Sequence, residues 1–109
     1  MDKRIIDAWA QPAFADALEK LPEIARLFKQ SGSSHLLETG LTAEQIIAAM
    51  DRTGIQTLML SAWHRPGQWV IHNDQIAEVT RQFPDRFVGV AAVNLEKPVE
   101  AVHELDRAI

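Results

Sequence analysis

Four side chains in the second half of the chain are of the types that grip a small acidic ligand. His64 and Arg65 follow an uncharged run of residues, Trp69 lies in the loop beyond them, and Asn94 follows a second apolar run. Imidazole, guanidinium and amide groups can hold a carboxylate, and an indole offers a flat face to a ring. We therefore interpret His64, Arg65, Trp69 and Asn94 as a binding set for a small carboxylic acid. A polar loop with Trp63 and Trp69 buried beneath it is the alternative interpretation.

Two pairs of side chains have the types that bind divalent metals. His64 and His72 form one pair, and His35 with Glu38 three residues later forms the other. The turn between His64 and His72 sets no ligand geometry, and no third ligand is evident. A solvated pair in a Ser- and Gly-rich loop accounts for His35 and Glu38. The sequence therefore predicts no metal site and identifies no catalytic residue.

The element that must position these residues is a buried strand. Residues 57–63 carry no charge, which is typical of a strand covered on both faces in a parallel sheet. Parallel neighbours are joined by crossover connections, so we expect one helix before this strand and another after it. Ligands of such sheets bind beyond the carboxyl ends of the strands, which is where His64 stands.

A first strand is predicted near the amino terminus. Residues 3–10 contain Ile5 and Ile6, which we expect to enter the core. Asp7 interrupts this apolar centre, so it is either an exposed edge residue or a polar group placed at a site.

The connection that follows is longer than the joining of two strands requires. Residues 13–20 and 22–30 are expected to be helical, and residues 31–35 form a loop. Because a connection of this length is unusual, we expect residues 11–41 to include a lid-like insertion that lies across a site.

Two helices are predicted on either side of the central strand. Thr42 and Gln45 form a capping box at the start of the first helix, and Gly54 ends it. Asn73 is expected to cap the second helix. A further strand, buried like the central one, is predicted over residues 87–93.

The two helix-strand units repeat at a spacing of about 30 residues, which is typical of (β/α) architectures. This spacing carries Leu60 onto Val90 and His64 onto Asn94. A third unit begins at Pro98. Right-handed crossovers between successive strands place every helix on one face, so the other face of the sheet would be bare. We expect it to be covered by a missing carboxyl-terminal barrel half or by another copy of the chain.

Three stretches of the chain resemble a known enzyme family. They are IDAWAQ, TGIQTLMLSAW and FPDRFVGVAAVNLEKPVEAVHELDRAI. They are similar to the amino-terminal region of amidohydrolase-related metal-dependent hydrolases, a branch that includes decarboxylases of aromatic and unsaturated carboxylic acids. The resemblance implies a partial (β/α) TIM-barrel-like fold, with residues 1–109 as a single domain corresponding to the amino-terminal portion of that barrel.

The same resemblance implies a divalent metal, usually zinc, held by a His-x-His pair after the first strand. These two positions fall on Trp9 and Gln11. An indole nitrogen only donates hydrogen bonds, and an amide oxygen is a poor zinc ligand. The family's other ligands, two histidines and an aspartate, come from later strands. We therefore expect no cofactor in this chain and no activity from it in isolation.

Composition excludes several other functions. The 109 residues form one modest domain, with a formal net charge of −4 and no cysteine. Nucleic-acid binding needs clustered Lys and Arg, which are absent, and no apolar run is long enough to span a membrane. These features fit a cytoplasmic protein. Two functions remain: a hydrolase or carboxy-lyase of amidohydrolase ancestry, or a non-catalytic half-barrel that binds or assembles by self-association.

Overall fold

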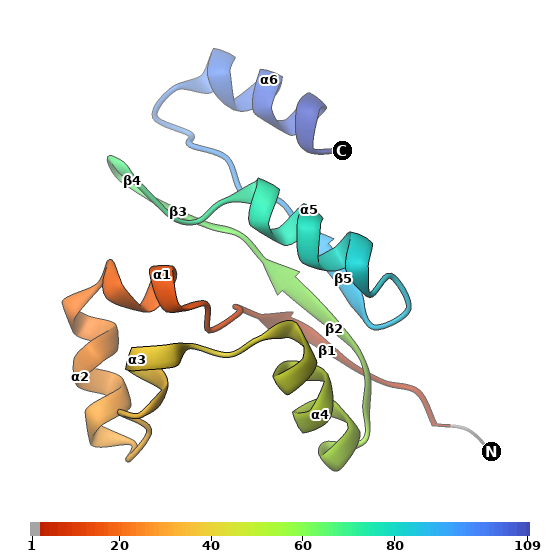
Figure 1. Cartoon of the computed structure of the whole chain (residues 1–109). Helices are drawn as coiled ribbons and strands as arrows, with labels where there is room; N and C mark the ends of the chain where they lie inside the picture. Colours follow the sequence, from red (N-terminus) through yellow and green to blue (C-terminus); the bar gives the residue numbers. More distant parts are fainter. Residues whose placement is uncertain (1–2) are drawn as a thin grey trace.

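The computed structural model describes residues 3–109 and shows a mixed α/β chain (Figure 1). Its strands are β1 (Ile5–Ala10), β2 (Ile55–Ser61), β3 (Trp63–Arg65), β4 (Gln68–Ile71) and β5 (Phe87–Val90). Its helices are α1 (Ala15–Glu19), α2 (Pro22–Gln30), α3 (Leu36–Thr39), α4 (Ala43–Thr53), α5 (Asn73–Gln82) and α6 (Pro98–Ala108). In residues 3–109 no helix is long and apolar enough to cross a membrane.

The main sheet has the strand order β1-β2-β5, and both of its strand pairs are parallel. Helix α4 lies in the connection from β1 to β2, and α5 lies in the connection from β2 to β5. The predicted α/β class, with parallel strands joined through helices, is therefore confirmed. The described residues form an open sheet and not a closed barrel.

The core lies on one face of this sheet. Leu60 of β2 and Phe87 of β5 are buried there, packed in the same cluster as Met50 of α4 and Ile76 of α5. Figure 1 shows α4 and α5 on the same side of the strands. The predicted placement of successive crossover helices on one face is thus confirmed, and each helix contributes one apolar stripe to a shared core.

The two flanking helices begin as their sequences require, with one correction. Thr42 Oγ1 accepts from the Gln45 backbone N–H at 3.2 Å, and Gln45 Oε1 accepts from the Thr42 N–H at 2.8 Å, so the predicted capping box is confirmed. Gly54 follows α4 with φ +77°, a left-handed conformation that glycine adopts without strain. The residue that caps α5 is His72 and not Asn73, which instead occupies the first position of the helix.

No helix within residues 3–109 lies over the opposite face of the sheet. Ile6 is 57% exposed and Val88 is 43% exposed, although both are apolar strand residues. The prediction that Ile5 and Ile6 enter the core is therefore wrong: Ile6 lies on the face that no helix of residues 3–109 covers, and Ile5, 49% exposed, stands at the start of an edge strand. The Cα radius of gyration is 15.0 Å, compared with about 13 Å for a compact chain of 100 residues. The chain is flat and open for its length.

The strands also differ from the predicted ones in burial and phase. The central strand is buried on one face only, since Met59 is half-buried, and β5 ends at Val90 instead of continuing to residue 93. Met59 lies opposite Val88, and Leu60 lies opposite Gly89. The repeat therefore holds for the helix caps but is one residue out of phase in the strands, since Leu58 lies opposite Phe87 and not Val88.

Residues 11–41 form a small helical layer beside the hairpin of β3 and β4. Lys20 Nζ donates to the backbone oxygens of Trp69 at 3.1 Å and Val70 at 3.3 Å. The Leu41 backbone N–H donates to the Ala13 oxygen at 2.8 Å, so the two ends of this segment are tied together. The predicted helix over 22–30 is present with the same bounds as α2, and the one predicted over 13–20 is shortened to α1, whereas α3 was not predicted.

Candidate functional site

A cavity of about 440 Å³ lies beyond the carboxyl ends of β2 and β5. Its walls come from the β3–β4 hairpin, the start of α5, the loop after β5, and α6. The side chains that line it include His64, Trp69, His72, Asn94, Glu96 and Glu100. This is the edge of a parallel sheet at which ligands of α/β proteins bind.

The hairpin holds two of these residues together. His64 lies opposite Trp69 in the antiparallel pair, and Gly67 makes the turn with φ +76°. The His64 ring meets the indole edge-on, with centroids 4.7 Å apart, and His72 lies 4.6 Å from the same indole. The sequence predicts a turn between His64 and His72 but gives no sign of the hairpin, because its strands are only three and four residues long.

Three of the four predicted binding residues line this cavity. They are His64, Trp69 and Asn94, although they come from separate segments of the chain. Arg65 does not join them: its Nη1 pairs with Glu23 Oε1 at 2.8 Å on α2. This ion pair holds the Arg65 guanidinium at α2, and Arg65 is not part of the cavity wall. The binding role of these residues stays a prediction.

Two cavity residues, His72 and Asn94, each use one side-chain atom in a local hydrogen bond. His72 Nδ1 accepts from the Asp74 backbone N–H at 3.1 Å, so in the neutral ring the proton resides on Nε2. Asn94 Oδ1 accepts from the Glu96 backbone N–H at 3.1 Å, which leaves the Nδ2 group as a donor. The cavity wall therefore carries one imidazole donor and one amide donor that remain free of these local contacts.

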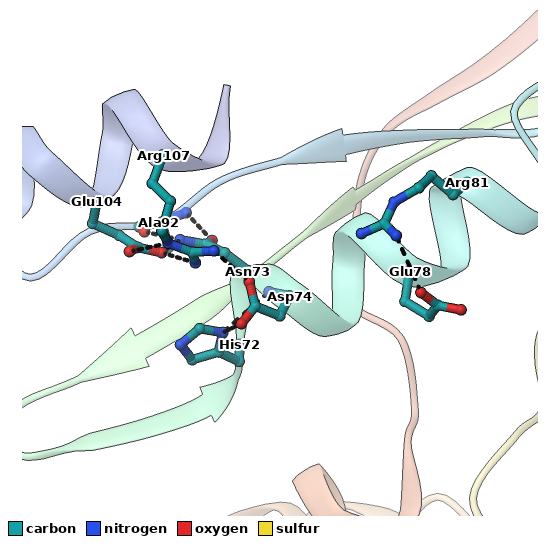
Figure 2. A network of polar contacts seen from close by, with 8 residues as sticks. All are labelled: His72, Asn73, Asp74, Glu78, Arg81, Ala92, Glu104 and Arg107. Carbon is teal, nitrogen blue, oxygen red and sulfur yellow. Dashed lines mark hydrogen bonds and ion pairs between the residues drawn. The ribbon is translucent and has the colours of Figure 1, made fainter.

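A polar network beside the cavity ties α6 to the start of α5 (Figure 2). Asn73 Nδ2 donates to the Ala92 backbone oxygen at 2.8 Å and to Glu104 Oε1 at 2.9 Å. Arg107 Nη2 donates to Glu104 Oε1 at 2.6 Å, and Arg107 Nη1 pairs with Asp74 at 2.8 Å. Sequence reasoning missed this network, because a buried Asn at a helix start has the same appearance as an ordinary cap.

The network shifts the ionisation of its charged members. Hydrogen bonds from Arg107 and then Asn73 lower the pKa of Glu104 to about 2. The same contact with Glu104, followed by that with Asp74, raises the pKa of Arg107. Glu104 is therefore a carboxylate whose charge is already matched by a neighbouring guanidinium.

The remaining charges around the cavity are mainly negative. Glu96 and Glu100 line it together with Glu104, against a single cation, Lys97. Lys97 Nζ lies 3.7 Å from Glu100 Oε2, and both side chains are largely exposed, so this ion pair is weak. Since Arg107 balances Glu104, the cavity retains an excess of carboxylate.

The metal implied by the family resemblance does not fit the residues at its expected position. Trp9 is 75% exposed at the end of β1, and neither its indole nor the Gln11 amide is a suitable zinc ligand. In the described part of the chain, no three His, Asp or Glu side chains gather as a ligand set, including those around His35, His64 and His72.

Comparison of the chain with protein families, with curated proteins and with solved structures finds no match. The resemblance to amidohydrolase-related enzymes therefore stays a prediction, based on the three stretches that suggested it. The geometry itself offers a polar cavity with an aromatic wall, two hydrogen-bond donors and several carboxylates.

Proposed function

We propose that this chain is a non-catalytic assembly module that self-associates through the uncovered face of the β1-β2-β5 sheet. The observation that carries this proposal is the exposure of apolar side chains on that face. Ile6, Val88 and Val90 are all exposed there, and β2 contributes the half-buried Met59 between them. Exposed apolar surface that spans a whole sheet is costly in water and is typical of an interaction site.

A second copy of the chain is the partner that suits this face. The side chains directed to it are Ile6, Thr57, Met59, Ser61, Val88 and Val90, none of which carries a charge. In a two-fold symmetric interface each patch meets itself, so a charged group near the symmetry axis would face its own copy. A face without charge avoids that repulsion, and two such sheets can pack about 10 Å apart.

Sedimentation velocity over a range of protein concentrations tests this proposal. The unaltered chain is expected to form dimers, and Val88→Lys is expected to weaken the association at least about tenfold by placing a charge within the apolar patch. Val99→Lys is the matched control, because Val99 is an equally apolar, 69% exposed residue on α6. A monomer at all concentrations, or equal loss in both variants, would contradict the proposal.

A second candidate function is the front of an amidohydrolase-like enzyme. The parallel order β1-β2-β5, with helices on one face and a cavity beyond the strand ends, supports it. The hydrolase or decarboxylase activity would then need further strands, supplied by a carboxyl-terminal half or a partner, and its substrate would be a carboxylic acid. This chain would hold no zinc of its own.

The proposed alignment with that family can be tested by restoring the metal pair. Trp9→His with Gln11→His is expected to raise zinc affinity, measured by native mass spectrometry, if these positions match the family's His-x-His pair. Ala8→His with Ala10→His is the control, with the same spacing in the wrong register. Equal zinc uptake by the two double variants would remove support for the alignment.

A further inference from the structure

We propose that the cavity between the hairpin and α6 binds a small organic cation that also carries a hydrogen-bond acceptor. This proposal goes beyond self-association, since the cavity and the uncovered sheet face involve different residues. The proposed ligand is positively charged, whereas the carboxylic acid suggested by the sequence is negatively charged. The volume of about 440 Å³ is adequate for one small molecule.

The charge around the cavity favours a cation. Glu96 forms no ion pair with any residue in 3–109, and Glu100 has only the exposed Lys97 at 3.7 Å. Glu104 is already matched by Arg107, whose guanidinium is not part of the cavity wall. An ammonium group would therefore find two carboxylates at the wall, whereas a carboxylate ligand would be repelled by them.

The residue that would have gripped a carboxylate is directed elsewhere. Arg65 forms its ion pair with Glu23 on α2, and the Arg65 hydrogen bond contributes to lowering the pKa of Glu23 after the hydrogen bond from the Glu23 backbone. The guanidinium is thus committed to α2, outside the cavity wall. Without Arg65, Lys97 is the one lysine or arginine among the described residues of the cavity wall.

The uncharged part of the ligand is determined by the other wall residues. His72 Nε2 and Asn94 Nδ2 are donors left free by the local contacts of these side chains, so they suit a hydroxyl or carbonyl oxygen. Trp69 adds an aromatic surface, held in place by the rings of His64 and His72. Aromatic side chains beside carboxylates form a favourable environment for an alkylammonium group.

Choline and its neutral isostere 3,3-dimethylbutan-1-ol separate charge from shape in this test. Titration of the ¹⁵N-labelled chain, followed by the Trp69 indole resonance, is expected to show choline binding at least about tenfold tighter than the neutral isostere, a free-energy difference of about 1.4 kcal/mol. Benzoate is expected to bind more weakly than choline. Equal binding of choline and the isostere, or tighter binding of benzoate, would overturn the proposal.

Charge-neutral substitutions locate the site. Glu100→Gln and Glu96→Gln are each expected to weaken choline binding several-fold while leaving the backbone spectrum unchanged away from the cavity. Glu19→Gln, at the exposed end of α1, is the control of equal charge change. Arg65→Ala is expected to leave choline affinity unchanged. If Glu19→Gln weakens binding as much as Glu100→Gln does, the attraction is a general effect of net charge and the proposed site is wrong.

Discussion

The side chain of Asn73 is paired with the backbone of Ala92 through two hydrogen bonds. Its Nδ2 donates to the Ala92 oxygen at 2.8 Å, and its Oδ1 accepts from the Ala92 N–H at 2.8 Å. An amide side chain here takes the place of a neighbouring strand, just after β5 has ended. The pairing satisfies backbone groups that would otherwise lack partners, and it fixes the path of the chain toward Asn94 at the cavity.

Asn73→Asp tests this pairing with little change in shape. Aspartate keeps the acceptor for the Ala92 N–H but loses the donor, and it places a carboxylate beside both the Ala92 oxygen and Glu104. We expect a loss of about 2–3 kcal/mol in the free energy of unfolding, measured by urea denaturation at fixed protein concentration. Asn94→Asp retains the hydrogen bond that its side chain accepts from the Glu96 N–H, and it should change stability by much less.

Glu104→Gln tests the ionised network through pH. A carboxyl group with a pKa lowered from 4.5 to about 2 stabilises the fold fully above about pH 4.5. That contribution is lost as the pH falls toward about 2. The unaltered chain should therefore lose stability across this window, whereas Glu104→Gln should be less stable at pH 7 and vary less with pH. Glu78→Gln, on the exposed face of α5, should preserve the acid dependence of the unaltered chain.

Gly89→Ala tests the close approach of β5 to α5. A Cβ at this position would lie 3.0 Å from Ile76 Cγ2 and 3.4 Å from Thr80 Oγ1. Because Ile76 is buried and has little room to shift, we expect a loss of about 1–3 kcal/mol in unfolding free energy. A thermal midpoint equal to that of the unaltered chain would show that α5 moves away freely.

Thr80→Val is expected to stabilise the chain. Thr80 Oγ1 is buried and has no hydrogen-bond partner within residues 3–109. Valine has nearly the same shape without the unpaired hydroxyl, so the free energy of unfolding should rise by about 1 kcal/mol. Thr53→Val is the control, because Thr53 Oγ1 donates to the Ala49 oxygen at 2.9 Å and substitution removes that bond. If the free energy of unfolding rises in both variants, the cause is the Thr-to-Val change in a helix as such and not the unpaired hydroxyl of Thr80.

Much of the fold could be predicted from periodicity and end signals. The capping box at Thr42, the left-handed Gly54 and the apolar stripes of α4 and α5 are local features, and a parallel sheet follows from their order along the chain. Burial could not be predicted in the same way. Ile6 and Met59 are apolar residues within strands, as core residues usually are. Whether a face of a strand is covered, however, depends on elements outside the strand.

The candidate site was predictable only in part, for a related reason. His64 and Asn94 do line one cavity beyond the carboxyl ends of β2 and β5, as the order of the sheet suggests, but His64 lies within β3 and Asn94 four residues after β5 ends. The direction of the Arg65 side chain could not be predicted, since the sequence does not indicate which residues of the short hairpin pair with one another. Asn73 and Glu104 are far apart in sequence, and no local pattern indicates that they meet.

The attachment of α6 has a consequence for the order in which the native chain opens. Ala101 is the one buried residue among those described in α6, while Val99 and Val102 face outward and the contacts to α5 are hydrogen bonds and ion pairs. Such contacts weaken as salt is added, whereas the apolar packing of α4 and α5 does not. Amide protons of α6 should thus exchange with deuterium before those of α4 and α5, and the difference should widen with ionic strength.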